Sequence, residues 1–178
     1  DKVKYFAGFG YVKQDALYGD TRTNKSTSGF NRYNARVNID ANIVDKYLNL
    51  SADMAYRQED RNSIAGSTSD VFNNMHRNPQ TDPGRFPDGN LGKVSLGVNP
   101  IGLATEGGWV KDRKSVLNTR FMLDFNVPGL EGLNLKGIFS YDKIFNSIKR
   151  WTTPVDFYVW NKITGEYDGH SPNREGAE

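Results

Sequence analysis

The chain has 178 residues, of which 37% are hydrophobic and 12% aromatic, so it is more polar than a typical compact globule yet too aromatic for a disordered chain. Its 23 basic and 21 acidic residues give a net charge of +2, which argues against a dedicated nucleic-acid-binding protein. The absence of cysteine excludes a disulfide framework and thiolate chemistry, and no apolar run is long enough for a transmembrane helix.

A first strand is expected over residues 3–14, where side chains alternate, although imperfectly, between two faces. Val3, Tyr5, Phe9 and Tyr11 fall on one face of this strand. The polar, turn-rich stretch 19–30 that follows predicts a loop.

The clearest alternation predicts a β-hairpin with strands over residues 32–44 and 48–60. Every second residue from Val37 to Ile43, and again from Leu48 to Tyr56, is apolar or small, and polar residues occupy most positions between them. The connection between the strands is short enough for a tight turn.

A second hairpin is expected over residues 115–127 and 133–148, joined by a turn at Pro128–Gly132. Between the two hairpins lies a long loop, residues 61–114, rich in proline and glycine. This loop contains one helix candidate at residues 69–77, with Ser69 or Asp70 as its N-cap. The sequence 152–160 predicts a further strand, followed by a turn at Lys162–Gly165, and residues 171–178 predict a loop or frayed end.

Alternation alone fits a soluble sandwich, whose apolar face meets a second sheet, and a membrane barrel, whose apolar face meets lipid. Tyr47 and Tyr56 are nine residues apart, a length that would span roughly 21 Å when tilted in a membrane, so they could belong to aromatic girdles at its two interfaces. Tyrosine is also a favourable strand residue, so this spacing leaves both interpretations open. The sequence offers no strong amphipathic helix to cover four apolar strand faces, which favours the membrane. Long loops on one side and tight turns on the other favour it too.

Polar residues alternate with the apolar ones and would face a water-filled lumen. These predicted lumen-facing residues are Arg36, Asn38, Asp40, Asp53, Arg57, Arg120, Asp124, Lys136 and Asp142.

Catalytic and metal-binding patterns are weak. His76 and His170 fall in different segments without a metal-binding motif nearby. Asp124 and Asp142 share a face of adjacent strands and could approach each other like a glycosidase pair, although an ion-pair ladder with Arg120 and Lys136 explains them more simply. The Asp82-Pro83-Gly84 and Asp88-Gly89 sequences fit turns better than a cation site. We therefore expect neither an enzyme nor a cofactor.

The ordered succession of these segments resembles the SusC/RagA family of TonB-linked outer-membrane transporters. The run NRYNARVNIDANIVDKYLNLSADMAYR, the preceding VKYFAGFGYVKQDALYG and the later PGLEGLNLKGIFSYD carry the resemblance. Loop motifs follow in the family's order: Asn78-Pro79, Phe86-Pro87-Asp88-Gly89, Asn99-Pro100, Gly107-Gly108-Trp109 and Lys149-Arg150-Trp151.

The resemblance implies an all-β fold in which the chain forms about four to six antiparallel strands of a 22-stranded transmembrane β-barrel with a long extracellular loop. The plug domain and the TonB-contacting segment of such transporters are not present, so the chain is expected to be an internal piece of a longer protein. Its implied location is the outer membrane of a Gram-negative bacterium, in contact with lipid.

The implied activity is TonB-dependent import of oligosaccharides or peptides, with a SusD-like surface lipoprotein as lid. The remaining barrel and plug are further implied partners, and nucleic acid is not one. Contact with substrate or lid is expected from Phe86, Asp88, Trp109 and Trp151. The alternative functions are a soluble β-sandwich that binds carbohydrate or mediates adhesion and, with less support, a small β-rich hydrolase.

Overall fold

A computed structural model describes residues 2–16, 28–130 and 132–170. Most of the loop predicted over residues 19–30, and the end predicted over 171–178, lie outside the described residues. The chain divides into two compact units. The first comprises residues 1–14, 30–60 and 112–147, and the second comprises residues 15–29, 61–111 and 148–178.

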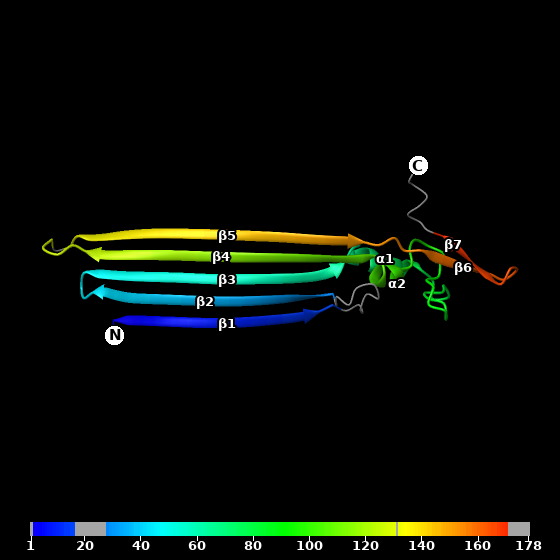
Figure 1. Ribbon diagram of the computed structural model, residues 1–178, viewed down its shortest axis with the longest axis horizontal. Helices are drawn as coiled ribbons and strands as arrows, with labels where there is room; N and C mark the ends of the chain where they lie inside the picture. Colours follow the sequence, from blue (N-terminus) through cyan, green and yellow to red (C-terminus); the bar gives the residue numbers. More distant parts are fainter. Residues whose placement is uncertain (1, 17–27, 131, 171–178) are drawn as a thin grey trace, which may run out of the picture. The chain divides into compact units, whose positions relative to one another are not determined.

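Five long strands form one antiparallel sheet, in which each strand pairs with its neighbours in sequence (Figure 1). The strands are β1 (Val3–Asp15), β2 (Gly29–Val44), β3 (Leu48–Ile64), β4 (Gly108–Asn126) and β5 (Asn134–Thr152). The expectation of a mostly antiparallel β fold is confirmed, and the sheet of the described residues is open, with β1 and β5 as its edges.

Strands β3, β4 and β5 extend further than their alternation predicted. The loop between β3 and β4 covers residues 65–107, which corrects the expected bounds of 61–114. Backbone pairing maintains these extensions, because Ala65 N donates to Gly108 O at 3.1 Å and Thr153 N donates to Gly107 O at 3.2 Å. The side chains of these extensions are more polar, so the alternation of apolar residues stops before the backbone pairing of the strands ends.

Tight turns join the strands at the other end of the sheet. Tyr47 N donates to Val44 O at 3.0 Å, and Lys46 adopts a left-handed conformation with φ of 71°. The Asn126 side chain donates to Lys46 O at 2.9 Å and so links this turn to the end of β4. In the second turn Gly129 has a φ of 86°, which a residue without a β-carbon adopts at little cost.

The second unit contains two helices, where the sequence predicted one, and a short hairpin. The elements are α1 (Thr68–Arg77), α2 (Pro100–Thr105), β6 (Phe157–Asn161) and β7 (Glu166–His170). The N-cap of α1 is Ser67, so the predicted caps, Ser69 and Asp70, were wrong. Asp70 lies instead in the first turn and Arg77 in the last, where both charges complement the helix dipole.

Two small hydrophobic clusters lie in the second unit, around Ile64 and around Leu91. Ile64 packs with Val71 and Ala104, joining the end of β3 to both helices. Leu91 packs with Val155 and Phe157 near the hairpin. These clusters show that the loop is folded.

Asn99 is the central polar residue of this loop and is only 1% exposed. Its side-chain amide donates to Gly84 O and to Gly92 O, each at 2.7 Å, and its side-chain oxygen accepts from Ile101 N at 2.9 Å. The last bond caps α2, whose first residue, Pro100, has no N–H to satisfy. One buried side chain therefore ties three loop segments together.

We predict that Asn99→Ala destabilises the loop locally by about 2 kcal/mol, because it leaves the buried Gly92 carbonyl and the Ile101 amide without the partner that Asn99 supplies and removes one of the two bonds to Gly84 O. Hydrogen exchange measured on the intact protein should become faster at Gly92, Ile101 and their neighbours. Asn73→Ala, at an exposed position of α1, is the matched control and should leave the exchange rates unchanged. Equal protection in both variants would contradict a central role for Asn99.

Candidate functional site

One face of the five-stranded sheet carries a polar network that crosses the strands. On β2, Arg36 Nε donates to the Asn38 side chain at 2.9 Å, and the Asn38 amide in turn donates to the Asp53 carboxylate on β3. Arg120 of β4 approaches the other oxygen of Asp53 at 4.0 Å. Residues that the sequence placed on one face therefore meet as a connected set.

The same face continues onto β5. Lys136 Nζ lies 3.6 Å from the Asp124 carboxylate, and Asn118 donates to Asp142 at 2.7 Å. Asn118 and Asn134, which bonds Asp124, were not chosen as site residues, although both share the polar register. Asn118 lies two residues before Arg120 on the same strand, and this spacing could have identified it as a residue of the polar face.

Asp124 and Asp142 do not approach each other, and the pair of Asp124 with Lys136 agrees with the simpler explanation by ion pairs. In the observed register Asp124 lies opposite Lys136 on β5, and Asp142 lies opposite Asn118 on β4. Asp124 and Asn118 are six residues apart along β4, so roughly 20 Å separates the two aspartates at 3.3 Å per residue. Retaining and inverting glycosidases hold their carboxyl groups within roughly 5–10 Å. The two aspartates therefore cannot act as one acid–base pair.

Two other predicted residues stand apart from this network. Arg57 pairs along its own strand with Glu59 at 3.3 Å. Asp40 is exposed and has no side-chain partner among the described residues.

A shallow hollow of about 360 Å³ lies on the polar face. Its polar lining comprises Arg36, Asp53, Asn118, Arg120, Ser140 and Asp142. Cationic, anionic and amide groups alternate there, and such a mixed surface can hydrogen-bond water, hydroxyl groups or peptide groups without favouring a net charge.

The opposite face of the sheet is apolar and uncovered. Large side chains on alternate positions remain exposed, with Ile39 at 41% and Phe139 at 62%. The other exposed members are Val3, Tyr5, Phe9, Val37, Ile43, Leu50, Met54, Phe121, Leu123, Leu135 and Tyr141. Within residues 2–16, 28–130 and 132–170, no second layer covers this face. A soluble monomer rarely exposes so large an apolar surface.

Tyrosines mark the limit of this apolar face toward the loop end. The Tyr11 and Tyr33 rings lie 5.1 Å apart on β1 and β2. On β3, the Tyr56 hydroxyl bonds Gln58 at 3.0 Å and Ser115 of β4 at 3.3 Å. Beyond this row the same face becomes charged, with Arg113 paired to Asp60 at 2.6 Å. An apolar band bounded by tyrosine hydroxyls suits the boundary between lipid and water.

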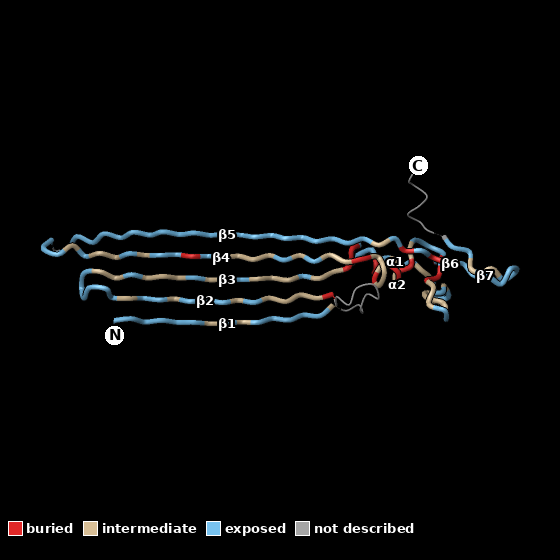
Figure 2. The backbone as a smooth tube through the Cα atoms, in the orientation of Figure 1, coloured by how far each residue is buried: buried red, intermediate tan, exposed pale blue. Residues whose placement is uncertain are grey.

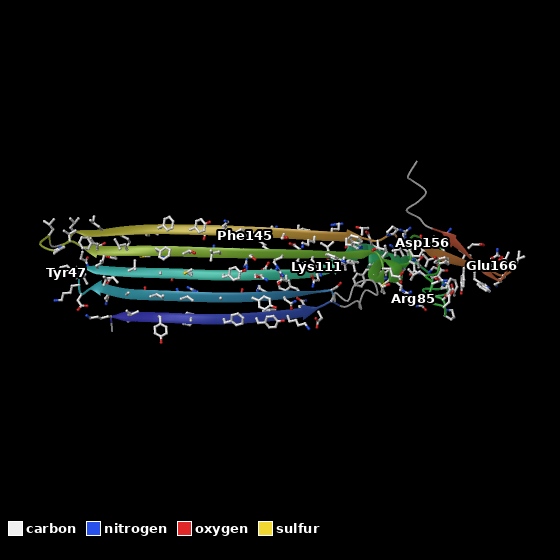
Figure 3. All side chains as sticks on the ribbon, in the orientation of Figure 1. Tyr47, Arg85, Lys111, Phe145, Asp156 and Glu166 are labelled. Carbon is white, nitrogen blue, oxygen red and sulfur yellow. The ribbon has the colours of Figure 1, made fainter. Side chains whose placement is uncertain are left out.

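The edge strand β5 is exposed along its whole length (Figure 2). An edge strand of 19 residues presents a row of unpaired N–H and C=O groups that can pair with a further strand. Apolar residues such as Phe145 (Figure 3) occupy this edge together with charged residues such as Lys143 and Lys149.

The four residues predicted to contact substrate or lid fall into two groups. The Phe86 ring lies 5.0 Å from Tyr167, which also contacts Trp160 at 4.9 Å and bonds Asp88 through its hydroxyl. Trp109 and Trp151 lie instead on the neighbouring strands β4 and β5. Tyr158, Trp160 and Tyr167 were recognised as aromatics of loops or strand ends, but their grouping was not predicted, because contacts between distant segments leave no periodic signal.

No group of side chains in the described residues is arranged to bind a metal ion. His76 belongs to α1 and His170 to β7. No helix among the described residues is long and apolar enough to cross a membrane. No protein-family model matches the chain, and no curated protein matches it significantly.

Partial desolvation raises the pKa of Tyr167 above its usual value, and the hydrogen bond to Asp88 raises it further. We predict that Asp88→Asn lowers the pKa part of the way, because the desolvation remains. In the native protein the contact with Asp88 stabilises the loop at pH values below about 10, the pKa of tyrosine in an unfolded chain. This stabilisation is lost as the pH rises through the higher pKa of Tyr167 in the folded protein. Tyrosinate absorbance, taken as the difference from Tyr167→Phe, measures the shift.

Asp156→Asn is the control for this titration, because Asp156 is exposed and has no described partner (Figure 3). It should leave the titration of Tyr167 unchanged. An unchanged pKa in Asp88→Asn would show that the carboxylate does not accept from the phenol.

Proposed function

We propose that this chain forms part of the wall and an external loop of an outer-membrane β-barrel transporter of the TonB-dependent, SusC/RagA-like kind. The observation that carries the proposal is the uncovered apolar face of the sheet. Each large apolar side chain moved out of water contributes about 1.5–3 kcal/mol, so the whole face strongly favours a nonaqueous neighbour.

The polar face and the open edges support the same proposal. Lipid does not satisfy backbone groups, so a sheet in a membrane must close through further strands. In the proposed barrel, the rest of the transporter pairs with β1 and β5, and the network around Asp53 lines the lumen. Short turns lie at the periplasmic end, and the folded loop 65–107 lies outside the cell.

The transport activity itself rests on the family resemblance. The imported cargo is an oligosaccharide or a peptide, and both present hydroxyl or amide groups that suit the mixed lining of the polar hollow. A SusD-like lipoprotein would cover the loop end, and TonB would act through parts of the transporter outside this chain. No covalent chemistry on the cargo is proposed.

Fluorophore quenching by lipid tests the membrane location. This chain has no native cysteine, so single substitutions Ile39→Cys and Asp40→Cys can be labelled on adjacent residues that face opposite ways. In the full-length protein, freed of any other cysteine and reconstituted in vesicles of chain-brominated lipid, the label at residue 39 should be quenched and that at residue 40 should not.

Absence of quenching at both positions would refute the membrane location. The soluble β-sandwich would then be favoured, because its apolar face packs against protein. Quenching at both positions would contradict a water-filled lumen.

A charge on the apolar face provides an independent prediction. Ile39→Lys should disfavour insertion by about 2–4 kcal/mol, because a lysine near the bilayer midplane is costly. The fraction of full-length protein that runs as a compact, heat-modifiable band measures assembly. Asp40→Lys is the matched control and should assemble normally; equal loss in both variants would show that the two faces do not differ.

A further inference from the structure

A pocket of about 550 Å³ lies within the second unit, where both helices and the segments between them line it. Small-molecule sites in proteins have volumes of roughly 300–1,000 Å³ and mostly apolar walls. The pocket has this size and this kind of wall. Its apolar lining residues are Val71, Met75, Pro79, Val94, Pro100, Ile101 and Ala104.

Most polar side chains on the pocket wall are already bonded within the loop. The Asn78 side chain donates to Asn74 O at 2.8 Å and accepts from Leu96 N at 3.2 Å. Thr105 Oγ1 donates to a backbone carbonyl of its own helix at 2.7 Å, and the Asn99 side chain makes the three bonds described above. Polar groups that are satisfied in this way do not require a polar ligand, so the wall favours an apolar ligand body.

Asp82 supplies the charge on the pocket wall, since the other lining residues in the described part of the chain are uncharged. Its carboxylate oxygens accept from the N–H and the hydroxyl of Ser95, at 2.7 and 2.8 Å. These bonds hold the carboxylate in place without neutralising it, because Ser95 is uncharged. No cationic side chain within residues 2–16, 28–130 and 132–170 pairs with Asp82. Each oxygen retains a lone pair for a further donor.

The last turn of α1 adds a negative potential at the same pocket. Met75 of this turn and the C-cap residue Asn78 line the pocket, and the last carbonyls of a helix carry a partial negative charge. The basic residues of this turn, His76 and Arg77, are exposed and do not line the pocket. The pocket therefore combines apolar walls with an electrostatic preference for a cation.

We propose that this pocket binds a small organic amine, with its apolar body against Met75 and Ile101 and its ammonium group against Asp82. Met75 is 57% exposed and Ile101 is 39% exposed, so the bound ligand would remove apolar surface of both from water. The ammonium group would donate to the fixed carboxylate in a charge-assisted bond, which is stronger than a bond between neutral groups. A neutral molecule gains only the apolar contact, so the site selects protonated amines.

Titration calorimetry of the full-length protein in uncharged detergent tests this site, with tryptamine and its neutral analogue tryptophol as probes. Near neutral pH tryptamine should bind roughly ten-fold more tightly, because a hydrogen bond between charged groups adds to the contact that both probes make. Asp82→Asn should abolish this preference and leave tryptophol binding unchanged, because the amide oxygen still accepts from Ser95. Asp70→Asn, at an exposed position of α1 outside the pocket, is the matched control and should change neither affinity.

Met75→Ala tests the apolar wall independently of the charge. Both probes should bind roughly five-fold more weakly, because less apolar surface is removed from water on binding. Leu96→Ala is the matched control, because Leu96 is 52% exposed but does not line the pocket. Equal weakening in the two variants would show that the probes do not occupy this pocket and would overturn the site.

Three further results would overturn the proposal. Equal affinities for the two probes would exclude selection of amines, and the absence of saturable binding of either probe would exclude a ligand pocket. Loss of tryptophol binding in Asp82→Asn would show that the carboxylate only holds the loop. Binding that appears only after partner chains are removed would show that a partner's side chain fills the pocket. The pocket lies wholly within the second unit, so these outcomes do not depend on the membrane location of the sheet.

Discussion

The separation of polarity across one sheet is the constraint on which the rest of this structure depends. Strand residues alternate between faces, so the register that joins Asn38, Asp53 and Arg120 on one side also fixes Ile39 and Phe121 on the other. A slip of one residue would exchange the faces, breaking the polar pairs and burying charge in the apolar layer. The hydrogen-bonded network therefore supports register as much as stability, since exposed ion pairs contribute little energy.

The open edges impose a second constraint of the same kind. Water can satisfy the unpaired backbone of β1 and β5, but it cannot solvate the apolar face between them at low cost, whereas lipid has the reverse properties. Neither solvent alone suits the described sheet. In the proposed barrel, further strands would pair with both edges and lipid would contact the apolar face, which would remove this conflict and give the long exposed edge of β5 a partner.

The sequence predicted the parts of the fold that repeat with period two. Alternation located the five long strands and the polar residues that meet, because each side chain reports its own face. It could not supply the cross-strand register, so it left open an approach of Asp124 to Asp142, whereas Asp124 pairs with Lys136 and Asp142 pairs with Asn118. The folded loop was also beyond prediction, since Asn99 acts through three backbone contacts that no spacing encodes.

The order within the loop bears on how it can recognise a partner. Asn74 of α1 accepts from Val98 N, and Asn78, the C-cap of this helix, accepts from Leu96 N, so the helix and its cap hold a segment that would otherwise be free. Gly92 passes so close to Pro83 that a β-carbon would lie 2.0 Å from its carbonyl oxygen. A loop fixed in this way loses little conformational entropy on binding, and its contacts therefore contribute more of their energy to affinity. In the proposed transporter, the shape that these backbone contacts set would determine selectivity at this surface, and changes at Asn99 or Gly92 would alter recognition although neither residue contacts the imported cargo.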